Sequence, residues 1–292
     1  EVSKADVVIT EIGGTVGDIE SLPFLEAIRQ LRRDVGAQNT FFIHNTLVPY
    51  LRAADELKTK PTQHSVKELR SIGIQPDMII LRTEVDINEQ MKEKIALFCD
   101  VKKEAVIQAK DAPILYEVVT SLHAQHVDDY ICDYFGFHTK PIDMSEWNAL
   151  IDRIKNLQGE INIALVGKYV QLHDAYLSVN EALKHAGYAL NKKIKIDWVS
   201  AEELTEENHV ERLKNADGIL VPGGFGIRAV EGKILAINYA RTNNIPFLGI
   251  CLGMQLCAIE FARNVLNLKD ASSTEFDENT SNPVITILDD KA

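Results

Sequence analysis

Short apolar runs alternate with amphipathic, helix-like stretches along most of this 292-residue chain, and this alternation constrains its fold more than any other feature. Alternating strands and helices form largely parallel sheets whose faces are covered by helices. Strands are predicted at residues 7–10, 41–44, 78–81, 105–107, 161–166, 194–199 and 218–221, and helices at residues 23–33, 62–71, 88–98, 145–156, 175–186 and 232–242. We therefore predict an α/β protein with two doubly wound, mostly parallel sheets.

The predicted elements form two sets, joined by a polar, amphipathic segment. A chain of this length can bury two independent cores. We predict a first domain at residues 1–140, a linker with a connecting helix at residues 141–159, and a second domain at residues 160–292. The chain begins without Met, and its last stretch, residues 285–292, contains no closing element. We therefore expect it to be an internal portion of a longer protein.

Composition argues against several classes of function. The formal net charge of −12 and the isoelectric point near 5.2 argue against non-specific binding of nucleic acid. No apolar run has the length of a membrane span, and no signal peptide opens the chain. The four cysteines are not spaced as metal ligands, which favours a reducing, cytoplasmic compartment. We therefore expect no nucleic-acid or membrane partner, while anionic small molecules need only a local basic pocket.

Cys251 stands where a nucleophile is made. Gly249 and Gly253 flank it at two residues on either side, an apolar run precedes it, and helical spacing follows it. This is the strand–nucleophile–helix turn of the G-x-S-x-G elbow with Cys in place of Ser. A thiolate is favoured at a helix N-terminus, as attack on a carbonyl requires. The alternative is a small buried apolar residue between two packing glycines.

The first half carries an acidic, glycine-rich segment directly after a predicted strand. Glu11 is expected at the carboxyl end of that strand, where ligands bind to open α/β sheets. Its carboxylate suits Mg²⁺ that bridges nucleotide phosphates, and the glycines that follow allow backbone amides to approach them. Asp18 and Glu20 come next and are able to accept hydrogen bonds from sugar hydroxyls or base amino groups. The alternative is a glycine-rich turn with solvated acids.

A second polar cluster lies at residues 58–65. Lys58 and Lys60 precede Pro61, which is able to open a helix, and hydroxyl and amide side chains follow. A helix N-terminus beside two ammonium groups forms an anion site. A solvated basic turn is the alternative.

Taken together, residues 11–30, 58–63, 95–99, 221–228 and 249–255 strongly resemble the CTP synthase family. The resemblance extends over nearly the whole chain. It implies a P-loop-like amidoligase (synthetase) domain followed by a class I glutamine amidotransferase domain, lacking parts at the beginning and the end respectively. In that family the synthetase phosphorylates O4 of UTP with ATP and Mg²⁺, and ammonia released from glutamine displaces the phosphate to give CTP. The family also implies activation by GTP, inhibition by CTP and a homotetramer.

The resemblance also implies roles for individual residues. Glu11 would be a Mg²⁺ ligand and Cys251 would form the glutamyl thioester. UTP or CTP would contact Asp18, Ile19, Glu20, Lys58, Thr59, Lys60, Pro61, Thr62, Gln63, Lys94 and Phe98, and the ATP adenine would contact Lys110, Asp111 and Ala112. Glutamine would be bound by Gly224, Leu252, Gly253, Met254, Gln255 and Glu275, with Gly224 at the oxyanion. Lys168 and Arg228 lie in segments that the family associates with GTP.

Two departures from the family pattern limit what this chain is expected to do alone. The family's phosphate loop, with its own lysine, is absent, and so are the His and Glu that activate the cysteine. His173, His185 and His209 precede the elbow and match neither. We therefore expect the isolated chain to complete neither reaction. Two other functions stay open: another ATP-dependent amidoligase fused to a class I glutaminase, and a catalytically dead regulatory relative.

Overall fold

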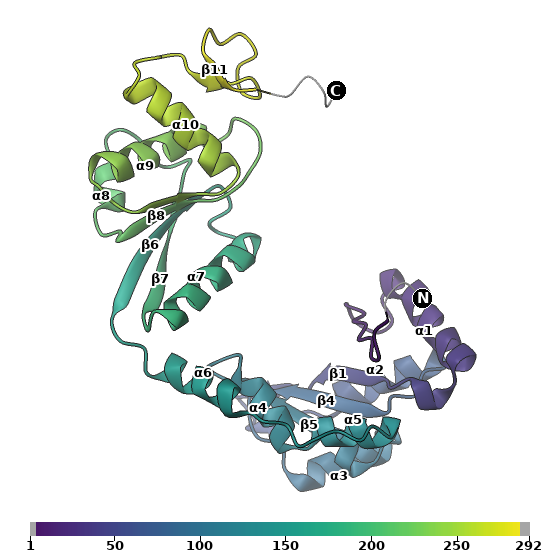
Figure 1. Cartoon of the computed structure of the whole chain (residues 1–292). Helices are drawn as coiled ribbons and strands as arrows, with labels where there is room; N and C mark the ends of the chain where they lie inside the picture. Colours follow the sequence, from purple (N-terminus) through teal and green to yellow (C-terminus); the bar gives the residue numbers. More distant parts are fainter. Residues whose placement is uncertain (1–3, 287–292) are drawn as a thin grey trace. The chain divides into compact units, whose positions relative to one another are not determined.

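The computed structural model describes residues 4–286 and divides into two compact units, residues 1–151 and 152–292, called unit 1 and unit 2 below (Figure 1). The division falls inside helix α6 (Ser145–Lys155), within the segment predicted as a linker. Of the last stretch, in which no closing element is expected, residues 287–292 lie outside the described residues.

Unit 1 is built on a parallel sheet with the strand order β1-β4-β5. The strands are β1 (Ile43–Leu47), β4 (Met78–Thr83) and β5 (Val106–Lys110). Their register pairs Ile43 with Met78 and Ile79 with Val106. Because all three strands run the same way, their carboxyl ends meet at one edge of the sheet, which is where ligands bind in such folds.

Helices cover both faces of this sheet. They are α2 (Lys60–Ser71), α3 (Glu89–Cys99), α4 (Glu117–Ala124) and α5 (Val127–Phe135). Successive side chains of a strand point to opposite faces. Ile79 and Leu81 of β4 accordingly pack with α2 and α3, whereas Met78 and Ile80 pack with α4 and α5. Unit 1 is therefore a three-layer α/β/α structure.

The strand predicted at residues 7–10 is wrong. The segment pairs with no strand within the described residues, and the exposed fractions of Val7, Val8 and Ile9 are 55%, 74% and 93%. Its β-branched residues favour a strand, but a strand forms only beside a partner whose backbone groups are free. The chain then passes through 3₁₀ helix η1 (Ile19–Ser21) into α1 (Leu22–Val35).

Unit 2 contains a parallel sheet with the order β7-β6-β8-β9. The strands are β6 (Glu160–Gly167), β7 (Lys193–Ser200), β8 (Gly218–Val221) and β9 (Phe247–Gly249). The chain moves from β6 outward to β7 and then returns to the other side of β6 for β8. The strand order therefore reverses between β6 and β8, and such a switch point leaves a crevice at the carboxyl ends of the strands.

The helices of unit 2 also lie on both faces of its sheet (Figure 1). Helix α7 (Leu177–Ala189) packs on one face, and α9 (Val230–Thr242) and α10 (Leu252–Asn264) share the larger core on the other. Apart from residues 7–10, every predicted strand and helix overlaps an observed one. The mostly parallel α/β class predicted from the sequence is confirmed.

Several shorter elements complete the described structure. They are 3₁₀ helices η2 (Ala37–Asn39), η3 (Lys103–Ala105) and η4 (His173–Tyr176), helix α8 (His209–Leu213), and strands β2 (Tyr50–Leu51), β3 (Glu56–Leu57), β10 (Ser272–Ser273) and β11 (Pro283–Ile285). Across residues 4–286, the model contains no helix with the length and apolar character needed to span a bilayer.

Candidate functional site

Cys251 lies in the sharp turn between β9 and α10, as the sequence predicts. Its backbone has φ 51° and ψ −107°, a conformation in which a non-glycine residue is strained. The residue is the N-cap of α10 and its side chain is exposed. Strain of this kind is characteristic of a nucleophile elbow, in which the turn lifts the reactive atom out of the sheet.

The two flanking glycines are required by close backbone contacts. A Cβ on Gly253 would lie 2.1 Å from the carbonyl oxygen of Val221 in β8, and a Cβ on Gly249 would lie 2.6 Å from the carbonyl of Gly253. Both distances are far below van der Waals contact. Absence of side chains at these positions therefore lets the first turn of α10 rest directly on the sheet.

The loop after β8, residues 222–229, lies against the cysteine. A Cβ on Gly223 would lie 3.5 Å from the Cβ of Cys251, and one on Gly224 would lie 3.6 Å from the side chain of Leu252. Within the described residues, the N–H of Leu252 donates no hydrogen bond, as expected for the first residue of a helix. An exposed thiol therefore stands beside a helix N-terminus and a glycine loop, at the carboxyl ends of β8 and β9.

Other residues selected from the sequence meet the same loop. Glu275, far along the chain, accepts a hydrogen bond from the N–H of Gly226 at 3.0 Å. The Nζ of Lys168, just after β6, donates to the carbonyl of Phe225. The guanidinium of Arg228 pairs with Glu202 at 2.7 Å. The carboxylate and both cations are thus gathered around residues 222–229.

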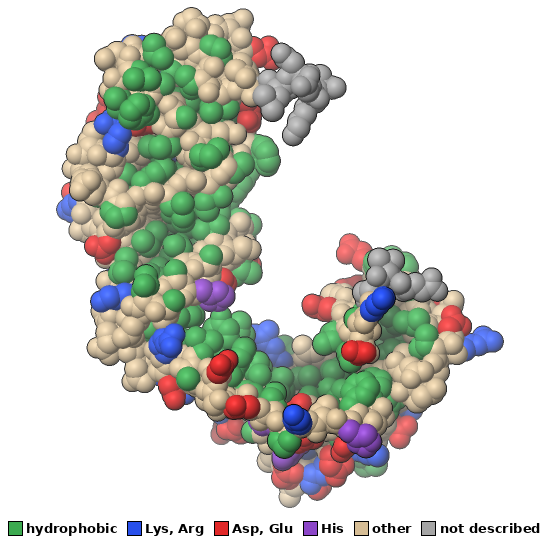
Figure 2. Space-filling view, in the orientation of Figure 1, with side chains coloured by type: hydrophobic (Ala, Val, Ile, Leu, Met, Phe, Trp, Pro, Cys, Tyr) green, Lys and Arg blue, Asp and Glu red, His purple; other side chains and the backbone are tan. Residues whose placement is uncertain are grey.

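The remaining residues selected at the start of α10 differ in exposure. Leu252 and Gly253 are buried, Gln255 is half-buried, and Met254 is 59% exposed. Large apolar side chains on the neighbouring loop are exposed as well, with Phe225 at 83% and Ile227 at 68%. Figure 2 shows that apolar side chains form much of the visible surface of unit 2.

One charged residue beside this loop was missed by the sequence analysis. Lys233 of α9 is 0% exposed, and its Nζ has no hydrogen-bond partner within the described residues. The ammonium lies 3.6 Å from the position that a Cβ on Gly224 would take. Burial, together with the nearby charge of Lys168, lowers the pKa of Lys233 to about 8. A lysine on a helix normally predicts a solvated face, so the sequence offered no signal.

The other cysteines are part of the cores. Cys99 is fully buried in unit 1, and burial raises the pKa of its thiol to about 11. Burial also raises the pKa of Cys257. Cys132 is half-buried. The environment therefore separates Cys251, which is exposed, from three thiols that the surrounding structure covers in full or in part.

In unit 1, the acidic segment lies on the surface. Glu11 is exposed, and the Oδ2 of Asp18 accepts a hydrogen bond from the N–H of Thr15 at 3.2 Å. Ile19 is 85% exposed, and Glu20 is exposed as well. A Cβ on Gly17 would lie 3.3 Å from the Cγ of Glu68, so the segment lies beside the later part of α2.

The second cluster opens α2, with Pro61 in its first turn. Lys60 is exposed, and Lys58 forms an ion pair with Glu56. The hydroxyl of Thr62 is fully buried and hydrogen-bonded to that of Thr46 at 2.6 Å, and Thr59 is buried too. The lysines are therefore directed to the surface, while the Thr62 hydroxyl holds the helix to β1. Within residues 4–286, no hydrogen bond or ion pair joins this cluster to residues 18–20.

A cavity of about 340 Å³ contains two of the residues selected from the sequence, Gln63 of α2 and Phe98 of α3. Its other lining residues are His64, Val66, Lys67 and Arg70. Lys67 and Arg70 follow Gln63 by four and seven positions, which places them on one face of α2. Lys94 precedes Phe98 by four positions and so shares its face of α3. Helical spacing from Gln63 was the signal that could have found the two additional cations.

The proposed adenine segment lies at the carboxyl end of β5. Lys110 ends the strand and pairs with Asp86 at 2.7 Å, and the N–H of Asp111 donates to the carbonyl of Thr83 at 2.9 Å. Ala112 follows and is half-buried. The Lys110 ammonium thus already has a carboxylate partner, and the Asp111 N–H is already bonded within the fold.

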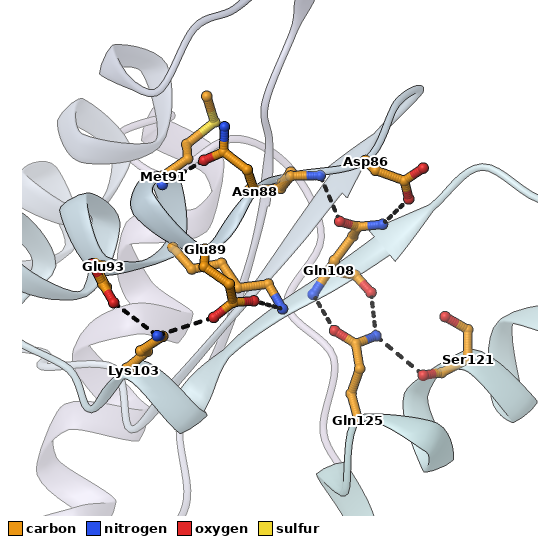
Figure 3. Close-up of polar contacts among 11 residues, drawn as sticks. Asp86, Asn88, Glu89, Met91, Glu93, Lys103, Gln108, Ser121 and Gln125 are labelled. Carbon is orange, nitrogen blue, oxygen red and sulfur yellow. Dashed lines mark hydrogen bonds and ion pairs between the residues drawn. The ribbon is translucent and has the colours of Figure 1, made fainter.

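Amide side chains hold this part of unit 1 in place. Figure 3 shows Gln108 of β5 joined to Asp86 on one side and to Gln125 on the other. Its Nε2 donates to Asp86 at 2.9 Å, and its backbone N–H and carbonyl bond with the Gln125 side chain at 2.9 and 2.8 Å. The strand is therefore tied both to the loop after β4 and to the end of α4.

The residues present were also tested for a metal site. Within residues 4–286, no group of three or more His, Cys, Asp or Glu side chains is arranged to hold a metal ion. Mg²⁺ commonly takes one or two protein carboxylates and completes its octahedron with phosphate oxygens and water. A single exposed carboxylate at Glu11 fits that requirement, but does not form a metal site without a nucleotide.

Comparison with known proteins agrees with both halves of the structure. Residues 1–137 match the family model "CTP synthase N-terminus", and residues 171–283 match "Glutamine amidotransferase class-I". Over 98% of its length the chain is 62% identical to a CTP synthase of Halalkalibacterium halodurans and 61% identical to one of Geobacillus kaustophilus, and it covers 54% of each. A Bacillus cytotoxicus CTP synthase is 60% identical, with the same two coverages.

A solved structure, titled as the Trypanosoma brucei CTPS glutaminase domain with bound acivicin, is 43% identical with a TM-score of 0.43, and the match covers 45% of this chain and 52% of that one. The chain spans about half the length of the curated relatives it matches. Two family models follow one another along it in the order that its two units have. The chain belongs to the CTP synthase family.

Proposed function

We propose that this chain is part of a glutamine-dependent CTP synthase, which aminates UTP to CTP with ATP and with ammonia from glutamine. The observation that carries the proposal is the exposed, strained Cys251 at the N-terminus of α10, facing a glycine loop at the switch point of its sheet. The proposed domains are a synthetase domain at residues 1–140 and a glutaminase domain at residues 160–292, with residues 141–159 linking them. The two compact units support this division.

In the glutaminase reaction, the Sγ of Cys251 attacks the side-chain carbonyl carbon of glutamine. The carbonyl electron pair moves to oxygen, where the amides of Gly224 and Leu252 are the proposed donors. When the carbonyl re-forms, ammonia leaves and a thioester remains on Cys251, which water then hydrolyses to glutamate. Glu275 is the proposed partner of the substrate's α-amino group, with Leu252, Gly253, Met254 and Gln255 along its side chain. The His and Glu that the family uses for proton transfer are not matched in this chain.

In the synthetase reaction, unit 1 is proposed to hold UTP and the adenine of ATP. Gln63 and Phe98 support a pyrimidine site, because they line one cavity with two cations beside it. The other proposed contacts to UTP or to inhibitory CTP are Asp18, Ile19, Glu20, Lys58, Thr59, Lys60, Pro61, Thr62 and Lys94, and those to the adenine are Lys110, Asp111 and Ala112. Glu11 would hold Mg²⁺, which neutralises charge on the nucleotide phosphates.

The proposals for regulation and assembly rest on the family resemblance. GTP would activate through the segments of Lys168 and Arg228, and the latter's guanidinium already lies 5.6 Å from the Tyr169 ring centroid. The proposed assembly is a homotetramer, and the proposed compartment is the cytoplasm.

The test is CTP formation by the full-length enzyme that contains this sequence, supplied with UTP, ATP and Mg²⁺ and with either glutamine or ammonium as nitrogen donor. We expect CTP with both donors, and none from residues 1–292 alone. Absence of CTP with either donor would support the dead regulatory relative. Amination of a different acid or nucleotide in a substrate panel would support the rival amidoligase. Gel filtration with and without UTP and ATP tests the tetramer.

A further inference from the structure

The side chain of Lys233 is not used by the proposed reactions, although it lies beside Gly224, the proposed oxyanion residue. It projects from the first turn of α9 into the largest core of unit 2, where the residue is fully buried. An ammonium has three donors and no acceptor capacity. Within residues 4–286, none of the donors of Lys233 has a hydrogen-bond acceptor, and no carboxylate lies within ion-pair distance.

Such a group destabilises the folded state. A buried ammonium loses its hydration, and the loss is ordinarily offset by a carboxylate or by several carbonyl groups. The neighbouring buried cluster of Glu260 and Arg241 shows how this unit satisfies charge elsewhere, with a bidentate ion pair and two asparagine amides. Lys233 lacks any comparable partner. A methionine of similar shape would fill the same space without this cost.

The groups around the Lys233 ammonium show which segment its charge lies beside. The ammonium stands beside Gly224, at 3.6 Å from the position a Cβ would take, and Leu252 lies at the same distance from that position. The preceding residue, Gly223, is the one that contacts Cys251. On the other side of the loop, Lys168 donates to the carbonyl of Phe225. Residues 223–226 therefore lie between two cations and beside Cys251.

We propose that Lys233 is a positioning residue of the thiol centre, whose buried ammonium stabilises negative charge on the carbonyl oxygen of a carboxamide or acyl group as it bonds to Cys251. Acting through the Gly224 segment, the cation favours the bond between Sγ and the carbonyl carbon, since the displaced electron pair becomes an oxyanion in its field. Charge in a water-excluded site acts far more strongly than in water. The inference rests on the proposed function of Cys251.

The experiment compares Lys233→Met, which removes the charge, with Lys233→Arg, which keeps it, in the full-length enzyme. Lys214→Met is the matched control, because Lys214 of unit 2 is solvent-exposed and paired with Glu211. The probes are glutamine turnover and inhibition by the aldehyde glutamate γ-semialdehyde, which adds the Cys251 thiol to its carbonyl and needs no leaving group. Ammonia-driven CTP formation reports on the synthetase domain.

For Lys233→Met we expect the glutaminase kcat to fall about tenfold and the aldehyde inhibition constant to rise about tenfold, with KM for glutamine within about twofold. The melting temperature of the variant should rise by about 3 °C, because an unpaired buried charge is removed. Lys233→Arg should recover most of the lost aldehyde affinity. Lys214→Met should match the wild type, and ammonia-driven synthesis should be unchanged in all three variants.

Equal kinetics of Lys233→Met and wild type would overturn the inference, as would equal losses in the Met and Arg variants, since shape rather than charge would then matter. If Lys233→Met does not fold, Lys233→Gln takes its place with the same expected losses. Failure of the proposed function has a separate signature, because glutamine turnover would then be absent from the wild type or would survive in Cys251→Ala.

Discussion

The candidate sites of the two units are built in opposite ways. In unit 2, residues from β6, β8, β9 and the loop before β11 converge on one strand-to-helix turn, and Cys251 occupies the centre. In unit 1, the selected residues are spread over the early loop, α2, α3 and the end of β5. Within residues 4–286, no hydrogen bond or ion pair joins the acidic segment to Lys58 or Lys60. A single junction is therefore sufficient to position the proposed nucleophile, whereas the proposed nucleotide site draws on residues from several elements.

The glycines of the two units show the same contrast. Gly249 and Gly253 leave room for backbone that would otherwise collide with a side chain. Gly13 of unit 1 has no atom within 4 Å of a Cβ added to it, and Gly14 and Gly17 are distinguished by φ values of 88° and 102°. Gly249 and Gly253 of unit 2 are therefore required by packing, and Gly14 and Gly17 of unit 1 by the path of the chain.

The largest expected effect tests whether unit 2 is an independent source of ammonia. Cys251→Ala in the full-length enzyme should lower glutamine-driven CTP formation by at least about 10³-fold, because the thioester step is lost. Ammonia-driven CTP formation should remain within about twofold of the wild type. Steady-state rates with the two nitrogen donors provide the measurement. Retention of glutamine-driven turnover would show that the nucleophile is another residue.

The thiols provide a second comparison between the units. At pH 8, iodoacetamide should alkylate Cys251 at least about 100-fold faster than Cys99, because Cys99 is buried and a thiol with a pKa of about 11 is about one-thousandth ionised at that pH. Peptide mass spectrometry after timed quenching measures both rates. Similar alkylation rates would mean that opening of the core of unit 1 makes Cys99 as accessible to the reagent as Cys251.

A third prediction concerns the glycines. Gly253→Ala should lower the free energy of unfolding of unit 2 by about 3 kcal/mol, because its Cβ would overlap the Val221 carbonyl. Gly13→Ala is the matched change in unit 1 and should stay within about 0.5 kcal/mol. Urea unfolding followed by circular dichroism and by tryptophan fluorescence, to which Trp147 of unit 1 and Trp198 of unit 2 contribute, measures both. Equal losses would remove the distinction between the two sets of glycines.

Phe98→Ala sharpens the interpretation of unit 1. If the cavity holds the pyrimidine as proposed, loss of the Phe98 ring should weaken UTP binding about tenfold, a typical value for one base–aromatic contact. Leu97→Ala is the control, because Leu97 is 79% exposed on the same helix and does not line the cavity. The KM for UTP and the inhibition constant for CTP are the readouts. Equal effects of the two substitutions would argue against the cavity as the pyrimidine site.

The smallest effect is a dependence of unit 1 stability on pH. Burial lowers the pKa of His44, whose Nε2 lies 2.8 Å from the Ser65 hydroxyl. The unfolded chain therefore binds the proton more readily, so stability falls as the pH drops below about 6.5, the ordinary value for histidine. His44→Gln should remove this part of the pH dependence. The urea midpoints of the wild type and of His44→Gln at pH 7.5 and 5.5 measure the difference. An equal fall in midpoint between the two pH values for both proteins would contradict the prediction.

Local chemistry explains what the sequence could predict. The elbow was predicted because Gly249, Cys251 and Gly253 lie within five residues and their requirements are local. Strands such as β8 were predicted to the residue because short apolar runs in parallel sheets are buried on both faces. The same reasoning failed at residues 7–10, because apolar character cannot supply a pairing partner.

Tertiary contacts explain what was missed. Lys67 and Arg70 share a face of α2 with Gln63, a spacing visible in the sequence, but the cavity beside them forms only where Phe98 of another helix lies against that face. Nothing in the sequence around Lys233 distinguishes it from a solvated lysine on a helix. Its burial arises from the packing of α9 against the loop after β8. Roles that depend on one helix or one turn are therefore accessible from sequence, and roles that arise between elements need the fold.

The contact of Gly253 with the carbonyl of Val221 also fixes the height of Cys251 above the sheet. Because the first turn of α10 rests directly on β8, the backbone of Cys251 cannot shift along the helix axis unless this contact is broken. Differences in the reactivity of the Cys251 thiol are therefore expected to come from the groups around it, such as Gly223 and Gly224, rather than from movement of its own backbone.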